Sequence, residues 1–139
     1  MKKLIALTLP FILLGCSSDS DENSNENNST ISIPSWLIGT WANEDMYSND
    51  QTVNGFKIKN NDLCIYNSVE ICHFEQANSM GYPLTIHRQI STENEYRLEL
   101  KTGGQPMTAY HFIKIDDTHM KLSEDIDRQN ANIVFVKVN

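Results

Sequence analysis

The sequence is short of basic residues and cysteines, and it has no long hydrophobic run. Its 139 residues include 11 Lys and Arg against 18 Asp and Glu, which gives a net charge of −7. A surface that follows nucleic-acid phosphates needs clustered basic side chains, so we expect no nucleic-acid partner. The length suits one ordinary domain and excludes a large multidomain protein.

The sequence also lacks the short motifs of common catalytic sites. It contains no G-x-S-x-G elbow, no glycine-rich phosphate loop and no nucleophilic cysteine motif. An acidic cluster, Glu124, Asp125 and Asp127, lacks the glycine and the terminal glutamate of an EF-hand loop, which favours a solvated loop. Four histidines lack the i, i+4 spacing of a local metal site, and we interpret them as ordinary exposed or hydrogen-bonded side chains: His73, His87, His111 and His119. We therefore expect no metal, no cofactor and no enzymatic activity, with a carboxylate pair formed across the fold as the open alternative.

The longest apolar run lies at the N-terminus. It extends over 11 residues from Leu4 to Leu14, interrupted by Thr8 and Pro10, and it follows Lys2 and Lys3. A membrane-spanning helix needs about 20 residues, so this run is too short to span a bilayer. A basic start followed by an apolar run of this length is typical of a signal peptide, which we predict over residues 1–15.

The end of this run resembles the lipobox of bacterial lipoproteins, in the residues Leu13, Leu14, Gly15 and Cys16. The resemblance implies cleavage before Cys16, a diacylglycerol thioether on its sulfur, and acylation, for example with palmitate, of the new N-terminus. Ser17 is similar to the residue that sends enterobacterial lipoproteins to the outer membrane, so we expect a lipid anchor there, on either its periplasmic or its surface face. The alternative is an ordinary signal peptide with an incidental cysteine.

Residues 16–33 are expected to form a tether between the lipid and the folded domain. From Ser17 to Asn28 the chain is acidic and rich in asparagine and contains no apolar residue, so it can bury nothing to offset the entropy of ordering. It also resembles the surface-export signal of some Bacteroidetes lipoproteins, with a plain solvated spacer as the alternative. Cleavage would change the net charge from −7 to −9, because it removes Lys2 and Lys3.

Residues 34–139 show the two-residue periodicity of β-strands. The clearest example is the alternation of Tyr96, Leu98 and Leu100 with charged residues, and no helical stripe continues over a dozen residues. Turn residues separate the segments, and we expect loops or a helical turn at Gln76–Tyr82 and Glu124–Asn132. This pattern predicts an all-β fold, a small antiparallel up-and-down barrel of eight or nine strands. The expected strands are Gly39–Asn43, Val53–Lys59, Leu63–Tyr66, Glu70–Glu75, Leu84–Ile90, Glu95–Lys101, Thr108–Ile115, Met120–Leu122 and Ile133–Val138.

The start of this domain carries a second resemblance. Gly39, Thr40 and Trp41 resemble the Gly-x-Trp motif in the first strand of lipocalins and fatty-acid-binding proteins, the calycin group. The resemblance implies a lipocalin-like barrel in which Trp41 packs across the base and Gly39 lets the chain pass close beneath it. In that family an arginine near the last strand covers the tryptophan, and Arg128 is the candidate here. The alternative for Trp41, and for Trp36, is plain core packing.

Cys64 and Cys72 are expected to form a disulfide, because export places them in an oxidising compartment. Cysteines directly opposite each other in a hairpin require an odd loop centred on Ser68, and this register also sets Ile65 against Ile71. A two-residue turn would place the thiols on opposite faces. The alternative, a redox or metal-binding pair, lacks the C-x-x-C spacing.

The barrel interior is the candidate binding site. Five residues are expected to face it: Ile86, Arg88, Leu98, Tyr110 and Phe112. A buried guanidinium needs an anionic partner, so Arg88 is the candidate for fixing the polar end of a ligand, with a solvated position at the rim as the alternative.

Two functions follow from this pattern. The first is a membrane-anchored module that binds a small apolar or amphipathic ligand inside the barrel. The second is a barrel filled by its own side chains that docks on an envelope protein or inhibits a foreign enzyme. In the second case Gln76–Tyr82, with Met80 and Tyr82 exposed, is a candidate contact surface.

Overall fold

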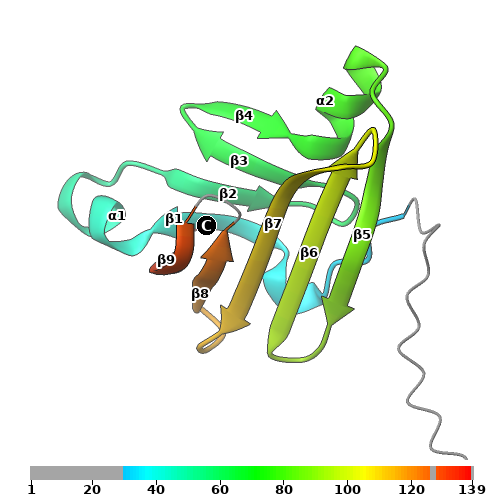
Figure 1. Cartoon of the computed structure of the whole chain (residues 1–139). Coiled ribbons are helices and arrows are strands. Elements are labelled where there is room, and N and C mark those ends of the chain that lie inside the picture. Colours follow the sequence, from blue (N-terminus) through cyan, green and yellow to red (C-terminus); the bar gives the residue numbers. More distant parts are fainter. Residues whose placement is uncertain (1–29, 126–127, 139) are drawn as a thin grey trace, which may run out of the picture.

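The protein folds into one curled antiparallel sheet of nine strands with two short α-helices (Figure 1). This is a computed structural model that describes residues 30–125 and 128–138, with side chains described for 30–123 and 132–138. The predicted signal peptide, Cys16 and most of the predicted tether lie outside these residues. In the described part, no helix is both long enough and apolar enough to cross a membrane.

The elements follow one another closely along the chain. A 3-10 turn, η1, precedes the first strand, and the two α-helices interrupt the run of strands at two points. The bounds are η1 Ser35–Leu37, β1 Gly39–Asn43, α1 Glu44–Asp50, β2 Asn54–Ile58, β3 Leu63–Asn67, β4 Val69–Cys72, α2 His73–Met80, β5 Leu84–Ser91, β6 Glu95–Thr102, β7 Gln105–Lys114, β8 His119–Asp125 and β9 Arg128–Val138.

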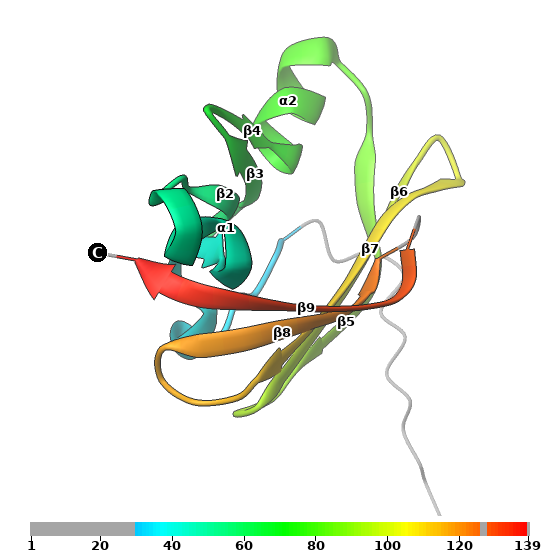
Figure 2. The same ribbon diagram turned by 90° about the vertical axis from the view of Figure 1, so that its left-hand side faces the viewer.

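The strands form an up-and-down meander. Their order in the sheet is β4-β3-β2-β1-β9-β8-β7-β6-β5, so every neighbouring pair is consecutive in sequence except β1 and β9. The first and last strands, β1 and β9, therefore pair in the middle of the sheet, and the sheet stays open with its edges at β4 and β5. Helix α2 contacts both edge strands. Figure 2 shows the resulting half-barrel, with β2–β4 facing β5–β7. The predicted all-β antiparallel fold is confirmed.

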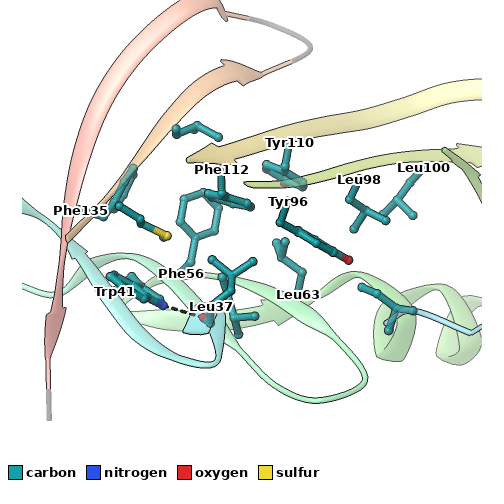
Figure 3. Packing of buried hydrophobic residues seen from close by; sticks show 14 of the residues in the cluster. Leu37, Trp41, Phe56, Leu63, Tyr96, Leu98, Leu100, Tyr110, Phe112 and Phe135 are labelled. Carbon is teal, nitrogen blue, oxygen red and sulfur yellow. Dashed lines mark hydrogen bonds between the residues drawn. The ribbon is translucent and has the colours of Figure 1, made fainter. Parts of the chain in front are cut away.

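The alternating apolar residues line the inner face of the curl. Tyr96, Leu98 and Leu100 are buried on β6, and Tyr110 and Phe112 are buried on β7. Leu37, Trp41, Phe56 and Leu63 meet them from the opposite wall (Figure 3). The period-two pattern forms strands here because it gives each strand one face to bury.

Two expected boundaries were wrong, and one helix was not expected. The strand expected over Glu70–Glu75 ends at Cys72, because helix α2 begins at His73. Strands β8 and β9 extend into Glu124–Asn132, which we expected to be a loop. Helix α1 was not predicted, since it has no buried residue and hence no apolar stripe. It is set by its cap instead, because the Asn43 side chain accepts a hydrogen bond from the Met46 N–H at 3.1 Å.

Candidate functional site

The inside of the half-barrel is occupied by a cluster of aromatic rings. The Phe56 ring lies 5.7 Å from Tyr110, 5.1 Å from Phe112 and 5.1 Å from Phe135, measured between centroids. Tyr110 and Phe112 stack at 5.7 Å on adjacent inward positions of β7. Figure 3 shows that these side chains point toward one another from both walls. The space that the sequence assigned to a ligand holds side chains of the protein itself.

Four of the five expected interior residues face inward. Ile86, Leu98, Tyr110 and Phe112 are buried members of this cluster. Arg88 is exposed, so its predicted inward position was wrong. The reason is a register shift in the β5–β6 pairing between Ile86 and Arg88, which reverses the faces of the residues that follow.

Gln89 takes the inward position after this shift. Its side-chain oxygen accepts hydrogen bonds from the Ser32 backbone N–H at 3.1 Å and from the Tyr96 hydroxyl at 3.3 Å. Gln89 therefore links the N-terminal segment to the core, where Ile31 is also buried. Burial raises the pKa of Tyr96, which keeps this hydroxyl a hydrogen-bond donor.

Trp41 is part of the buried core. It is fully buried, and its indole N–H donates to the Leu37 carbonyl oxygen at 2.8 Å (Figure 3). Lys137 on β9 covers the ring, with Nζ 5.1 Å from its centroid. The side chain of Arg128 lies outside the described part. Gly39 adopts φ 140°, a backbone conformation that residues with a side chain rarely adopt, which is why a glycine is needed at this position.

Cys64 and Cys72 form the predicted disulfide. The β3–β4 ladder pairs Cys64 with Cys72 and Ile65 with Ile71 and leaves Ser68 between the strands, so the predicted register is confirmed. Ser68 adopts φ 60°, the left-handed conformation that lets so short a connection turn. Because the two sulfurs are bonded to each other, their proximity to the Glu70 carboxylate does not make a metal site.

Two lysines cover this disulfide on the outer face of the sheet. Lys57 Nζ lies 2.8 Å from one oxygen of Glu70, and Lys59 pairs with the other oxygen. Lys59 Nζ also lies 3.5 Å from Cys72 Sγ. The hydrogen bonds from Lys57 and Lys59 hold the pKa of Glu70 below its ordinary value, and the Glu70 carboxylate raises the pKa of Lys59. One carboxylate is thus shared by two ammonium groups.

The opposite face of the same hairpin is apolar and exposed. Ile65 and Ile71 are paired directly, Val69 lies on their face, and Ile65 continues the face of buried Phe56 beyond the packed core. Eight large hydrophobic side chains are exposed in the described part, and five of them lie between residues 65 and 82. Their exposed fractions are Ile65 40%, Val69 65%, Ile71 45%, Met80 58% and Tyr82 62%. We call this set, which comes from β3, β4, the end of α2 and the turn after it, the apolar segment.

Helix α2 is held in place by an aspartate from a distant turn. The buried carboxylate of Asp62 accepts backbone hydrogen bonds from Phe74 at 3.1 Å, Glu75 at 3.0 Å and its neighbour Leu63 at 2.8 Å. Since Cys72, the residue before the helix, offers no side-chain cap, Asp62 supplies the acceptor that the helix start requires. Sequence reasoning missed this cap, because no local pattern connects Asp62 to a helix that begins 11 positions later.

An open cleft of about 530 Å³ lies beside this cap. It separates the N-terminal segment from the β2–β3 turn and helix α2, so it lies outside the aromatic interior. Two of its lining side chains are apolar and the others are polar or charged: Ile31 and Phe74, with Thr30, Lys59, Asn61, Asp62, Glu75 and Asn78. This arrangement can hold a small molecule that carries both an apolar part and hydrogen-bonding groups.

Comparisons of the chain with protein-family models, with curated proteins and with solved structures found no match.

Proposed function

We propose that this chain is a lipid-anchored protein of the bacterial outer membrane whose β domain is a protein–protein interaction or inhibitor module, acting by binding rather than catalysis. The observation that carries the binding role is the apolar segment. It concentrates exposed apolar side chains on one hairpin and around the end of the helix that follows, and exposed apolar side chains that are grouped in this way are typical of contact sites.

The filled interior supports the same role. A barrel that carries a lipid tail needs a cavity of a few hundred Å³ between its walls, as about 300 Å³ is the lower end for ligand pockets. Here Phe56, Tyr110, Phe112 and Phe135 occupy that position. Because the interior is packed, a domain of this kind can bind a partner only through its outer surface.

The proposed anchor rests on the lipobox-like residues Leu13–Cys16 and on the acidic tether. Several acyl chains would hold the domain on a membrane, since each buried methylene contributes about 0.8 kcal/mol. Membrane fractionation tests this part. We expect the natural chain in the outer-membrane fraction and a Cys16→Ala variant to be absent from it, whereas an unchanged distribution would contradict lipidation at Cys16.

Site-specific photo-crosslinking in cells tests the interaction role. A photoreactive residue at Val69 or Tyr82 should crosslink to one and the same envelope or foreign protein, and the same residue at exposed Ile115 should not. The identified partner, once purified, should bind the natural chain and lose binding to Val69→Lys. Crosslinking at neither position, or equally at Ile115, would contradict the role.

A second candidate function is supported by the cleft. Its mixed lining suits a small amphipathic ligand held between Phe74 and the polar side chains around Asn78. Native mass spectrometry of the Cys16→Ala chain purified from cells would reveal a bound mass. A mass that disappears in Phe74→Ala would favour this candidate, and an unliganded chain would disfavour it.

A further inference from the structure

The two edges of the curled sheet are protected differently. β4 pairs only with β3, and β5 pairs only with β6. Edge strands expose unpaired backbone groups, and proteins commonly protect them with bulges, prolines or charges. β5 has all three, because Pro83 precedes it, its ladder shifts after Ile86, and Arg88 is exposed. β4 has an unbroken ladder, and its only charged side chain, Glu70, is bound by lysines of its own sheet.

The backbone groups at the free edge of β4 can be assigned. The Cα atoms of Cys64 and Cys72 lie 3.9 Å apart, closer to the about 4.5 Å of a non-hydrogen-bonded antiparallel pair than to the about 5.5 Å of a hydrogen-bonded one. Since the two kinds of pair alternate, the pair Tyr66–Glu70 is also non-hydrogen-bonded. The N–H and C=O of Glu70 and the N–H of Cys72 therefore point away from β3. The C=O of Cys72 faces the first turn of α2.

The side chains at this edge define what a paired strand would meet. A residue opposite Glu70 would lie on the outer face, beside the ammonium groups of Lys57 and Lys59, which share one carboxylate. Asp62 and Glu75 attract Lys59 more weakly than Glu70 does. A second carboxylate at this position would give each lysine its own partner. The two residues flanking it would lie on the inner face, against the exposed Val69 and Ile71.

We propose that the free edge of β4 pairs with an extended segment of a partner protein that has the pattern apolar–acidic–apolar. This inference rests on the proposed interaction function and gives its partner a chemistry. Backbone hydrogen bonds supply affinity in such strand addition, and alternating side chains supply specificity. The Cys64–Cys72 disulfide holds β4 against β3, so the edge is already ordered before the partner arrives and binding costs less entropy.

A second copy of this chain is a weaker occupant of the same edge. Val69, Glu70 and Ile71 have the required pattern, but each copy would also bring Lys57 and Lys59. The excess of ammonium over carboxylate groups would then double instead of being removed. We therefore assign the edge to a segment without these lysines.

Peptide binding to the purified Cys16→Ala chain tests this assignment. One synthetic peptide has a central Val-Glu-Val, and its matched control has Val-Lys-Val. We expect the glutamate peptide to bind at least about tenfold more tightly, equivalent to about 1.4 kcal/mol. It should slow hydrogen exchange at the amides of Glu70 and Cys72. N-methylation of the central peptide nitrogen should remove binding, because this nitrogen is the donor to the Glu70 carbonyl oxygen.

Three variants complete the test. Ile71→Lys should abolish peptide binding, and Ile115→Lys, at another exposed apolar residue just after β7, should leave it unchanged. Replacing both lysines (Lys57→Met with Lys59→Met) should remove or reverse the preference for the glutamate peptide, because the Glu70 carboxylate then has no lysine partner. The inference would be overturned if Ile71→Lys left peptide binding unchanged, or if the folded natural chain bound no peptide. It would also be overturned if the natural chain formed a dimer that Ile71→Lys dissociates. Crosslinking from Val69 and Tyr82 to an envelope protein, without peptide binding, would retain the interaction function and overturn strand addition alone.

Discussion

His73 Nε2 lies 2.8 Å from the hydroxyl oxygen of Tyr110, so one hydrogen bond joins the start of helix α2 to strand β7. Both side chains are buried, and their rings lie 5.6 Å apart. The other ring nitrogen, Nδ1, has no hydrogen-bond partner in the described part of the chain. Helix α2 therefore begins on a histidine that is best accommodated without charge.

Acid should weaken the fold through His73. Burial lowers the pKa of His73 below its ordinary 6.5, and the nearby Asp62 carboxylate opposes this only in part. The unfolded chain then binds the proton more readily, so stability is lost as pH falls below about 6.5. Urea unfolding at pH values from 7.5 to about 5 measures this loss. His73→Gln, which does not ionise, should flatten the pH dependence, and exposed His87→Gln should not. Equal slopes for all three chains would contradict it.

Removing the disulfide should weaken the β3–β4 hairpin without unfolding the domain. The crosslink spans a sequence separation of 8, for which the loop-entropy model gives about 2–3 kcal/mol. In the double variant Cys64→Ala, Cys72→Ala we expect this loss in urea unfolding and faster hydrogen exchange at Ile65 and Ile71. The amides of β6 should stay protected, because their ladder partners are β5 and β7 and not the hairpin. Loss of the near-ultraviolet circular dichroism of the core would contradict this prediction.

The register shift in β5 leads to opposite expectations for adjacent residues. Arg88→Ala removes an exposed side chain, so its effect should stay within about 0.5 kcal/mol. Gln89→Ala removes the acceptor shared by the Ser32 N–H and the Tyr96 hydroxyl and should cost about 1–3 kcal/mol. Urea unfolding of the two variants measures both. A larger loss of stability for Arg88→Ala than for Gln89→Ala would indicate that the Arg88 guanidinium faces the interior after all.

The strands, their turns and the Cys64–Cys72 register could be predicted, because each depends on residues close in sequence. Period-two alternation reports which side of a strand is buried, and the disulfide constrains a single hairpin. The bulge before Arg88 could not be predicted in this way. It depends on how β5 and β6 fit together, and the alternation of Ile86, Arg88 and Ile90 continues through it without a break.

Contacts between distant segments were also beyond local patterns. Lys137 covers Trp41 because β1 pairs with β9. These two strands lie at opposite ends of the domain sequence and meet only in the folded sheet. Asp62 caps α2 for the same kind of reason, since the β2–β3 turn lies beside the helix only in the folded chain. The exposure of the apolar segment could be predicted only in part. It was predicted for Met80 and Tyr82 and is confirmed. The exposure of Ile65 and Ile71 was not predicted, because two apolar residues that pair across a hairpin are expected to be buried.

Asp62→Ala should loosen helix α2 selectively. It removes the acceptor of the Phe74 and Glu75 N–H groups, and loss of a capping side chain costs about 1 kcal/mol, up to about 2. Hydrogen exchange at these two amides should rise more than at any amide of β6. The matched variant Asn43→Ala removes the cap of α1 and should affect Met46 instead. Equal protection of α2 in both variants would show that packing alone holds the helix.

Gly55→Ala should destabilise the junction between the two halves of the sheet. Gly55 pairs with Ala42, and a Cβ there would overlap the carbonyl oxygen of Trp41 and lie 3.1 Å from the Phe135 ring. That carbonyl belongs to β1, which connects β2–β4 to β9, so it can move only by disturbing both ladders. We expect a loss of about 1–3 kcal/mol, as for other overpacked sites. Gly81→Ala is the control, because it meets no atom within 4 Å and carries only the cost of its positive φ, about 1 kcal/mol. A Gly55→Ala chain as stable as the natural one would mean that β1 can shift away from β2, and the half-barrel would then lack the rigid seam on which the β3–β4 hairpin depends.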